Sequence, residues 1–143
     1  MDWLGTVTVV GLVVLVALIV IFLKVRMKDL VEEHVRRRSA GSRVCSRADL
    51  VEGIERIPVA LALTDDTIYY ENPDLQASLE LRRIDEVEYD DETVTGHGVT
   101  GKALRLRSHG HTFEFVLDSE TARKWEMALP AHRIDDGPAA QAV

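Results

Sequence analysis

The longest apolar run of the chain stands at its N-terminal end. The twenty-one residues from Trp3 to Leu23 include no charged side chain. As an α-helix they would rise about 30 Å, which matches the hydrocarbon core of a bilayer. The pattern predicts a transmembrane helix over residues 1–23, with Trp3 as an aromatic anchor at one interface.

Other interpretations of this run fit less well. A cleaved signal peptide has a basic segment before its apolar core and a small-residue cleavage site, whereas only Met1 and Asp2 precede this run. A buried helix that is apolar on all faces would need a larger domain around it. Gly5 and Gly11 are six residues apart, so the span lacks the G-x-x-x-G spacing that favours helix dimers.

Basic side chains flank the span on its C-terminal side only. These juxtamembrane residues are Lys24, Arg26, Lys28, Arg36, Arg37 and Arg38. The positive-inside rule then predicts a single-pass protein of the plasma (inner) membrane, with the N-terminus outside and the C-terminal domain in the cytoplasm.

Residues 24–42 predict a juxtamembrane helical stalk and a hinge. Helix formers continue past the span, and Glu33 precedes Arg37 at the favourable i, i+4 spacing. A narrow apolar stripe that includes Val31 fits packing on the domain, on a partner helix or on the bilayer, and the pattern does not choose among them. The segment Ser39 to Ser42 predicts the hinge.

The periodicity changes after Arg43. Ser46 to Asp49 resembles a capping box and predicts a short helix before Gly53. Beyond it, alternating apolar and polar residues separated by turns predict a meander of antiparallel strands, with an irregularity at Arg82 and Arg83. The expected strands lie within residues 57–63, 67–70, 75–81, 84–89, 102–107 and 111–117.

One amphipathic helix is expected after the last strand. Asp118 or Ser119 caps it, and Ala122, Trp125 and Leu129 fall on one face. We expect Trp125 to anchor this helix in the core. The chain after Pro130 is rich in small residues and predicts a frayed end. The prediction is therefore one domain over residues 43–133 and a disordered tail over 134–143.

Charge is divided unevenly between the two parts of the chain. Residues 43–143 carry eleven Lys and Arg against twenty Asp and Glu, a net charge of −9, whereas residues 1–42 carry +2. An acidic module repels phosphate backbones, so nucleic acid is not an expected partner. Cys45 is the only cysteine, which predicts a free structural thiol in a reducing compartment.

Candidate chemistry is sparse. GHGVTG (Gly96 to Gly101) fits a phosphate-binding glycine pattern, but the residues after it alternate like a strand, and such loops must open a helix. His97, His109 and His111 would form a metal site only if their two loops met at one end of the sheet. The acidic turns lack the spacing of a calcium loop. We therefore predict no catalytic residue, no cofactor site and no metal site.

Several phrases of the chain resemble pleckstrin-homology (PH) domains, in particular the GRAM and bacterial PH-like branches. They are VALALTDDTIYYEN, LELRRIDEVEY, KALRLRSHGHTFEFVL and the Trp125 helix, which together cover about residues 51–129. The resemblance implies a small antiparallel barrel or sandwich closed by a C-terminal helix, and a protein that binds lipids or proteins. The first-strand loop of phosphoinositide-binding members is basic, whereas here it reads Thr64-Asp65-Asp66, so phosphoinositide binding is not expected. An OB-fold is the alternative.

These observations predict a mainly β protein with an N-terminal transmembrane helix that is held by the bilayer and docks a protein partner. Two alternatives stay open. One is a membrane-lipid sensor that uses the basic stalk at Arg36 to Arg38, and the other is a metal enzyme that uses the three loop histidines.

Overall fold

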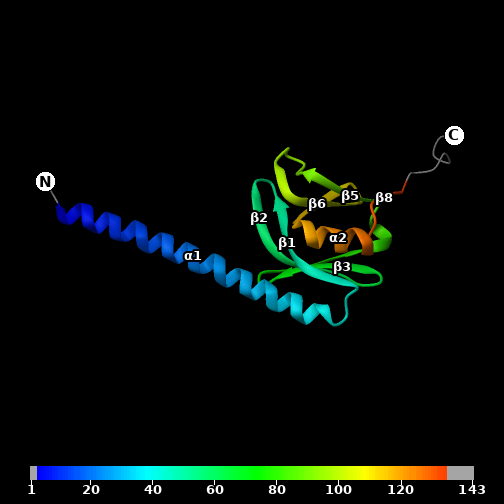
Figure 1. Cartoon of the computed structure of the whole chain (residues 1–143), viewed down its shortest axis with the longest axis horizontal. Coiled ribbons are helices and arrows are strands. Elements are labelled where there is room, and N and C mark those ends of the chain that lie inside the picture. Colours follow the sequence, from blue (N-terminus) through cyan, green and yellow to red (C-terminus); the bar gives the residue numbers. More distant parts are fainter. Residues whose placement is uncertain (1–2, 135–143) are drawn as a thin grey trace.

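The computed structural model of the chain describes residues 3–134. A long helix, α1 (Trp3–Ser39), precedes an antiparallel sheet, and a shorter helix, α2 (Ser119–Ala128), follows most of it (Figure 1). The strands are β1 (Val44–Glu52), β2 (Glu55–Leu63), β3 (Thr67–Asn72), β4 (Leu75–Glu80), β5 (Glu86–Glu92), β6 (Gly98–Ser108), β7 (His111–Leu117) and β8 (His132–Arg133), with a 3-10 turn, η1 (Leu81–Arg83), before β5. The predicted class, mainly β with a long N-terminal helix, is confirmed.

Helix α1 continues without a break past Leu23 to Ser39. The segment from Gly5 is long and apolar enough to cross a membrane, and the apolar side chains described in its first half are exposed. The stalk is thus the same helix as the apolar run, and together they extend about 55 Å. The predicted hinge is a hydrogen-bonded turn, in which the Ser42 hydroxyl donates to the Arg38 carbonyl at 2.6 Å.

The sheet has the strand order β4-β3-β2-β1-β7-β6-β5-β8, with every neighbouring pair antiparallel. β1 pairs with β2 along its whole length but with β7 only at Asp49 and Leu50. At this short pairing the sheet bends, so that its two halves face each other. Side chains from both halves consequently reach one core, and Tyr70 on β3 lies edge-on to Phe115 on β7 with ring centroids 5.4 Å apart.

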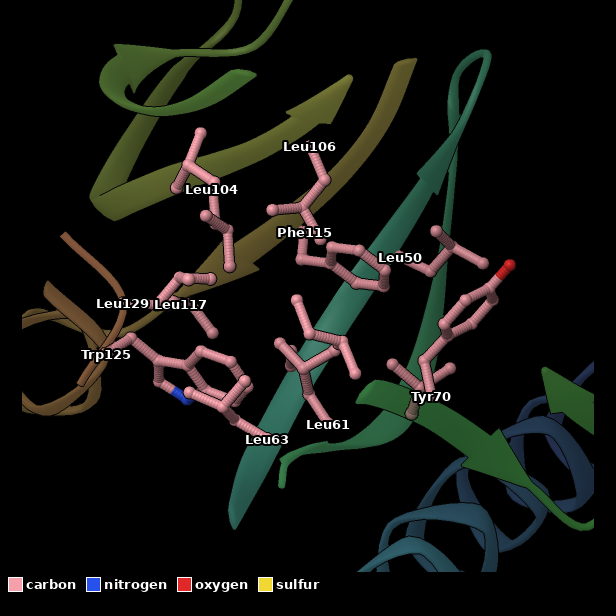
Figure 2. Packing of buried hydrophobic residues seen from close by; sticks show 14 of the residues in the cluster. Leu50, Leu61, Leu63, Tyr70, Leu104, Leu106, Phe115, Leu117, Trp125 and Leu129 are labelled. Carbon is pink, nitrogen blue, oxygen red and sulfur yellow. The ribbon is translucent and has the colours of Figure 1, made fainter. Parts of the chain in front are cut away.

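The core lies between the two halves of the sheet and is covered at one end by α2 (Figure 2). Leu61, Phe115 and Trp125 are fully buried. The indole Nε1 of Trp125 donates to Ser46 Oγ at 2.8 Å, so its one polar group is paired inside the core. Trp125 therefore occupies the position that the sequence predicted.

The short helix predicted before Gly53 is wrong, because residues 46–49 belong to β1. Ala48 and Leu50 point into the core, while Arg47 is exposed. Ser46 lies on the inner side with them and accepts the Trp125 hydrogen bond, so it caps no helix. Of the polar residues that suggested a capping box, Arg47 and Asp49 lie on the outer face of the strand and Ser46 lies on its inner face.

The chain does not fray directly after Pro130. β8 (His132–Arg133) pairs with β5, and the Ile134 backbone N–H donates to the Asp85 carbonyl at 2.8 Å. The Tyr89 hydroxyl also donates to the Leu129 carbonyl at 2.8 Å, which fixes the end of α2 to β5. The remainder of the predicted tail, residues 135–143, lies outside the described residues.

The turns expected after β3 and β6 and the cap of α2 are confirmed, but Thr64 to Asp66 joins β2 to β3 and is not the loop between the first two strands, which is the β1–β2 turn at Gly53 and Ile54. Asn72 Oδ1 accepts the Asp74 N–H at 2.9 Å in the β3–β4 turn. His109 and Gly110 have φ of 49° and 79° in the β6–β7 turn, which suits a tight hairpin. Asp118 caps α2 by accepting the Thr121 N–H at 2.8 Å. The irregularity at Arg82 is η1.

Candidate functional site at the junction of the long helix and the sheet

The second half of α1 packs on the outer face of β1, β2 and β3. Val31 is fully buried there. On β2, Val59, Leu61 and Leu63 face the core, so the buried residues between them, Ala60 and Ala62, face α1 because successive side chains alternate across a strand. Their small side chains let the helix approach closely. Of the three alternatives for the apolar stripe, the structure shows packing on the domain.

Arg38 holds the C-terminal end of α1 to this face. Its Nε donates to Glu71 Oε2 at 3.2 Å, its Nη2 donates to the other carboxylate oxygen, and its guanidinium lies 4.2 Å above the Tyr69 ring. Glu71 is only 6% exposed. The hydrogen bonds with Glu71 raise the pKa of Arg38 further. A buried carboxylate thus has its cation supplied by the helix, which makes the contact specific to one docking position.

Cys45 lies beneath the same junction. Its Sγ donates to the Val35 carbonyl of α1 at 3.4 Å. Burial raises the pKa of the thiol to about 11, so it stays protonated at neutral pH. A protonated, half-buried thiol is a poor nucleophile, and the geometry therefore agrees with a structural cysteine.

A pocket of about 280 Å³ opens between α1, β1, β2, the start of β6 and the end of β7. Its cationic lining residues are Lys28 from α1, Arg47 from β1 and Arg56 from β2. Gly101 forms part of the wall, and a Cβ there would come within 1.9 Å of the Leu117 carbonyl oxygen. Gly101 is therefore needed for close strand contact, which gives a structural reason for one glycine of GHGVTG.

The rest of GHGVTG has no phosphate-binding geometry. Gly98 to Gly101 are the first residues of β6, and no helix follows them. The expectation that this pattern joins strands is confirmed, with the refinement that its second half lies within a strand.

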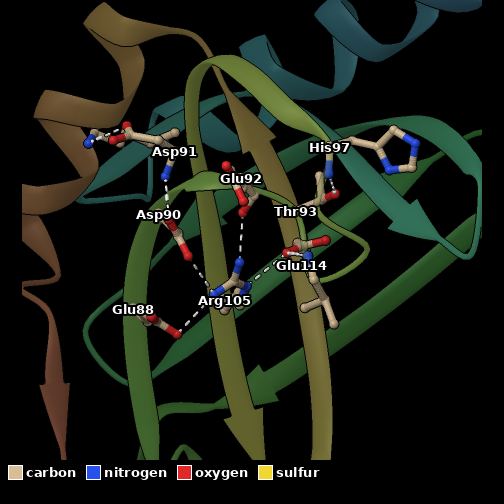
Figure 3. A network of polar contacts seen from close by, with 10 residues as sticks. Glu88, Asp90, Asp91, Glu92, Thr93, His97, Arg105 and Glu114 are labelled. Atoms are coloured by element: carbon tan, nitrogen blue, oxygen red, sulfur yellow. Dashed lines mark hydrogen bonds and ion pairs between the residues drawn. The ribbon is translucent and has the colours of Figure 1, made fainter.

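A second polar cluster lies on the outer face of β5, β6 and β7, centred on Arg105 (Figure 3). Arg105 Nε donates to Glu114 Oε2 at 2.9 Å, and Nη1 lies 3.1 Å from Glu88 and 3.0 Å from Asp90. Glu114 is 5% exposed and also accepts the Val94 N–H at 2.9 Å. The Asp91 backbone N–H, with Arg105, lowers the pKa of Asp90. These groups bind each other and fix the β5–β6 loop.

The three loop histidines are not brought together. His97 precedes β6 and His109 follows it, so the length of this strand, roughly 30 Å, separates them. Within residues 3–134, no three His, Cys, Asp or Glu side chains are placed to hold a metal ion. The hypothesis that the two loops meet at one end of the sheet is wrong, because the loops lie at opposite ends of β6.

The predicted juxtamembrane residues fall into two groups. Lys24, Arg26 and Lys28 directly follow the apolar run and are exposed. Arg36 and Arg37 are exposed at the far end of α1, where Arg38 is engaged with Glu71. Trp3 and Leu23 lie on the exposed half of the helix, with Gly11 between them.

Sequence reasoning missed the two buried glutamates. Glu114 stands between Phe113 and Phe115, and Glu71 follows Tyr69 and Tyr70. A charged residue inside an aromatic strand is a signal for a paired outer face, but its partner cannot be read locally.

Comparison with protein-family models, curated proteins and solved structures finds no match.

Proposed function

We propose that the chain is a single-pass membrane protein whose cytoplasmic, PH-like domain holds a protein partner at the inner face of the plasma membrane. The observation that carries the proposal is the contact between α1 and the outer face of the sheet. One uninterrupted helix contains the apolar run and also docks on the sheet through Val31 and the Arg38–Glu71 pair. A domain fixed in this way presents one surface at a constant height and direction, which suits a docking module.

The strand order and the C-terminal helix support a PH-like assignment. Seven antiparallel strands in the order β4-β3-β2-β1-β7-β6-β5 curl around a core that α2 covers. This agrees with the plan of that superfold, and it accounts for Trp125 better than an OB-fold does. Fold alone assigns no activity.

A docking role without catalysis fits the polar groups of the domain. Arg105, Glu114, Glu71 and Asp118 are engaged in ion pairs or a helix cap. The net charge of −9 beyond residue 42 favours a partner with basic surface over anionic polymers.

Crosslinking in native membranes tests the proposal. A photo-crosslinking residue is placed at exposed Gln76 on β4 or at Arg123 on α2, and adducts of the full chain are identified by mass spectrometry. We expect one dominant protein adduct from one of these faces. The matched control is Val31→Asp, which should undock the domain and weaken that adduct. Recovery of the same mixed background from both positions and from the control would refute a docking function.

Membrane insertion and orientation have their own test. We expect the chain to resist extraction by alkaline carbonate, and a protease added to the cytoplasmic side to cut the domain. Release by carbonate, or protection of the domain in inside-out vesicles, would overturn the topology.

The alternative of a membrane-lipid sensor at Arg36 to Arg38 has less support than the docking proposal. Arg36 lies roughly 20 Å along the helix axis from Leu23, beyond the headgroup layer for a helix that leaves the bilayer upright. Arg38 already has a buried partner in Glu71.

A further inference from the structure

One edge of the sheet is open along a whole strand. Strand β4 stands first in the strand order and, within residues 3–134, pairs only with β3. The opposite edge ends in β8, which has two residues, and such short edge strands offer little to pair with. β4 has six residues and contains no Pro, Lys or Arg, the residues that commonly block pairing at an edge.

The backbone groups of β4 point alternately toward β3 and toward the open side. Asn72 faces Leu75 across the two-residue β3–β4 turn, and the residues that close such a turn form a hydrogen-bonded pair. The Leu81 N–H donates to the Asp66 carbonyl at 2.8 Å, which has the same phase. Every second residue of β4 therefore directs both its N–H and its C=O away from β3. These outward-facing residues are Gln76, Ser78 and Glu80.

The core-facing side of β4 is less covered than that of β3. The core-facing apolar residues of β3, Ile68 and Tyr70, are 0% and 8% exposed. Those of β4 pack against the same core but are only half-buried. They are Leu75, Ala77 and Leu79. A further strand beside β4 would cover this apolar strip and satisfy the outward backbone groups together.

Acidic side chains gather at one end of the edge. A second pocket, of about 630 Å³, opens there between the β2–β3 turn and the start of η1. Its charged lining residues are Asp65, Asp66, Glu80 and Arg82. Arg82 Nε donates to Glu80 at 2.6 Å, whereas Asp66 accepts from two neutral hydroxyls. Within residues 3–134, neither aspartate forms an ion pair.

This charge indicates what kind of strand the edge accepts. A second copy of the chain would bring together two domains that each carry a net charge of −9 beyond residue 42, and like charges oppose that pairing. Basic side chains on a different partner would instead complement Asp65 and Asp66. Because β4 is about 20 Å long, an extended segment of about six residues would match it.

We propose that β4 binds an extended segment of the protein partner as an added antiparallel strand, with basic residues at the N-terminal end of that segment beside Asp65 and Asp66. Its alternate apolar side chains lie over the half-buried face of β4, and its backbone bonds the outward groups of Gln76, Ser78 and Glu80. Antiparallel pairing continues the pattern of the whole sheet. This site deepens the proposed docking function and rests on it.

Hydrogen exchange with a model peptide tests the edge. The probe is a capped peptide with lysines at its N-terminal end, followed by alternating valine and threonine, and it is added to the full chain in detergent. We expect saturable binding that slows amide exchange at Gln76, Ser78 and Glu80 by about tenfold or more. The Ala77 and Leu79 amides, which already bond β3, should change little. Absence of saturable binding, or binding without this alternation, would overturn strand addition.

Ser78→Pro removes one outward N–H and leaves the bonds to β3 in place. We expect it to weaken peptide binding by about tenfold, whereas the control Ser78→Thr, which keeps the N–H, should bind as the original chain does. Near-UV circular dichroism of Trp125 checks folding. A peptide with its central threonine N-methylated removes a bond to the same residue from the other side, and it tests the unsubstituted chain. Unchanged affinity for this peptide would contradict a backbone contact at Ser78.

Charge reversal tests the basic end of the partner segment. We expect Asp65→Lys to weaken binding of the lysine peptide by about tenfold at low salt. The matched control, Glu120→Lys, makes the same charge change at an exposed position on α2 and should alter binding little. Equal losses in the two variants would leave only a general charge effect and overturn the acidic end as part of the site.

Crosslinking in native membranes separates this site from the docking function. We expect the dominant adduct to form from Gln76 and to be lost in Ser78→Pro. A dominant adduct from Arg123 alone would overturn the β4 site and leave docking in place, whereas no specific adduct from either position would overturn both. An adduct at Gln76 with a second copy of the chain would assign the edge to self-association and overturn the partner segment.

Discussion

Glu71 and Glu114 are both nearly buried and both bind an arginine, but they stabilise different parts of the molecule. Glu114 pairs with Arg105 inside one sheet, and this guanidinium, 15% exposed, also reaches two further carboxylates. Glu71 pairs with Arg38 from α1, which is 39% exposed and has one carboxylate partner. The sheet network belongs to the fold of the domain, whereas the junction is a single contact between helix and domain. Folding and docking should therefore be separable.

The largest effect is expected from Arg105→Met. This change leaves Glu114 buried without its cation and leaves Glu88 and Asp90 repelling each other, so we expect the free energy of unfolding to fall by about 3 kcal/mol. Thermal unfolding of the full chain in detergent, followed by near-UV circular dichroism of buried Trp125, measures it. Arg107→Met is the control, because Arg107 is 53% exposed and 3.6 Å from Glu86, and it should cost less than about 0.5 kcal/mol. Equal losses would show that burial of the pair is not the cause.

Val31→Asp should undock α1 while the domain stays folded. A carboxylate at the fully buried position 31 cannot be solvated unless the helix leaves the sheet. Undocking exposes Cys45, so we expect its alkylation rate by N-ethylmaleimide to rise about tenfold or more as the pKa of the thiol falls from about 11 toward its ordinary value. Asp29→Ala, on an exposed position of the same helix, is the control. A simultaneous loss of the near-UV signal would contradict separable docking.

Arg38→Gln should weaken docking more gently. Once the helix moves away, water reaches Glu71, so the loss is limited to the docking equilibrium and amounts to about 1 kcal/mol. This corresponds to about a fivefold rise in Cys45 alkylation. The double variant Arg38→Gln/Glu71→Gln keeps a neutral hydrogen-bonded pair and should recover part of the protection. No recovery would indicate that Tyr69 stacking, and not the carboxylate, holds the end of α1.

The smallest effect is a pH dependence at the start of α2. The Thr121 N–H lowers the pKa of Asp118 below its ordinary 3.8, so its ionised form adds stability above that pH, and this stability is lost as pH falls through the lowered value. Asp118→Asn keeps the cap without titrating. The difference in melting temperature between the two chains should therefore be constant near neutral pH and change only below about pH 4. A change between pH 5 and 7 would point to another group.

The sequence was a good guide to the sheet and a poor one to its attachments. Strands β3 to β7 follow from alternation, because each has one apolar face, whereas β2 follows from a short apolar run that is buried on both faces, and Trp125 follows from helical spacing. The segment from Ser46 to Asp49 failed because its outer residues are polar and its inner serine serves a distant indole. That kind of partner is fixed by tertiary packing and not by local pattern.

The junction and the pocket show the same limit. Arg38 and Glu71 are 33 residues apart, and Lys28, Arg47 and Arg56 come from three elements, so neither group shares a periodicity. The apolar stripe on the stalk correctly included Val31, which is buried. One apolar residue cannot indicate which surface it packs against, however, so the pattern left three surfaces open. The histidines failed for a topological reason, since one strand places its two ends apart.

Because α1 is unbroken from its apolar half to Ser39, its length also fixes the rotation of the domain about the helix axis. Each residue of an α-helix advances the chain by about 100° around the axis, so one extra residue between Leu23 and Met27 would rotate the whole domain by that angle relative to the apolar half of the helix, while moving it about 1.5 Å along the axis. Seven extra residues would return the domain almost to its original rotation about the axis, because seven steps of about 100° are close to two full turns. If α1 spans a bilayer, the number of residues in this helix therefore sets which face of the domain a neighbour in the bilayer would meet, and only insertions close to a whole number of turns keep that face.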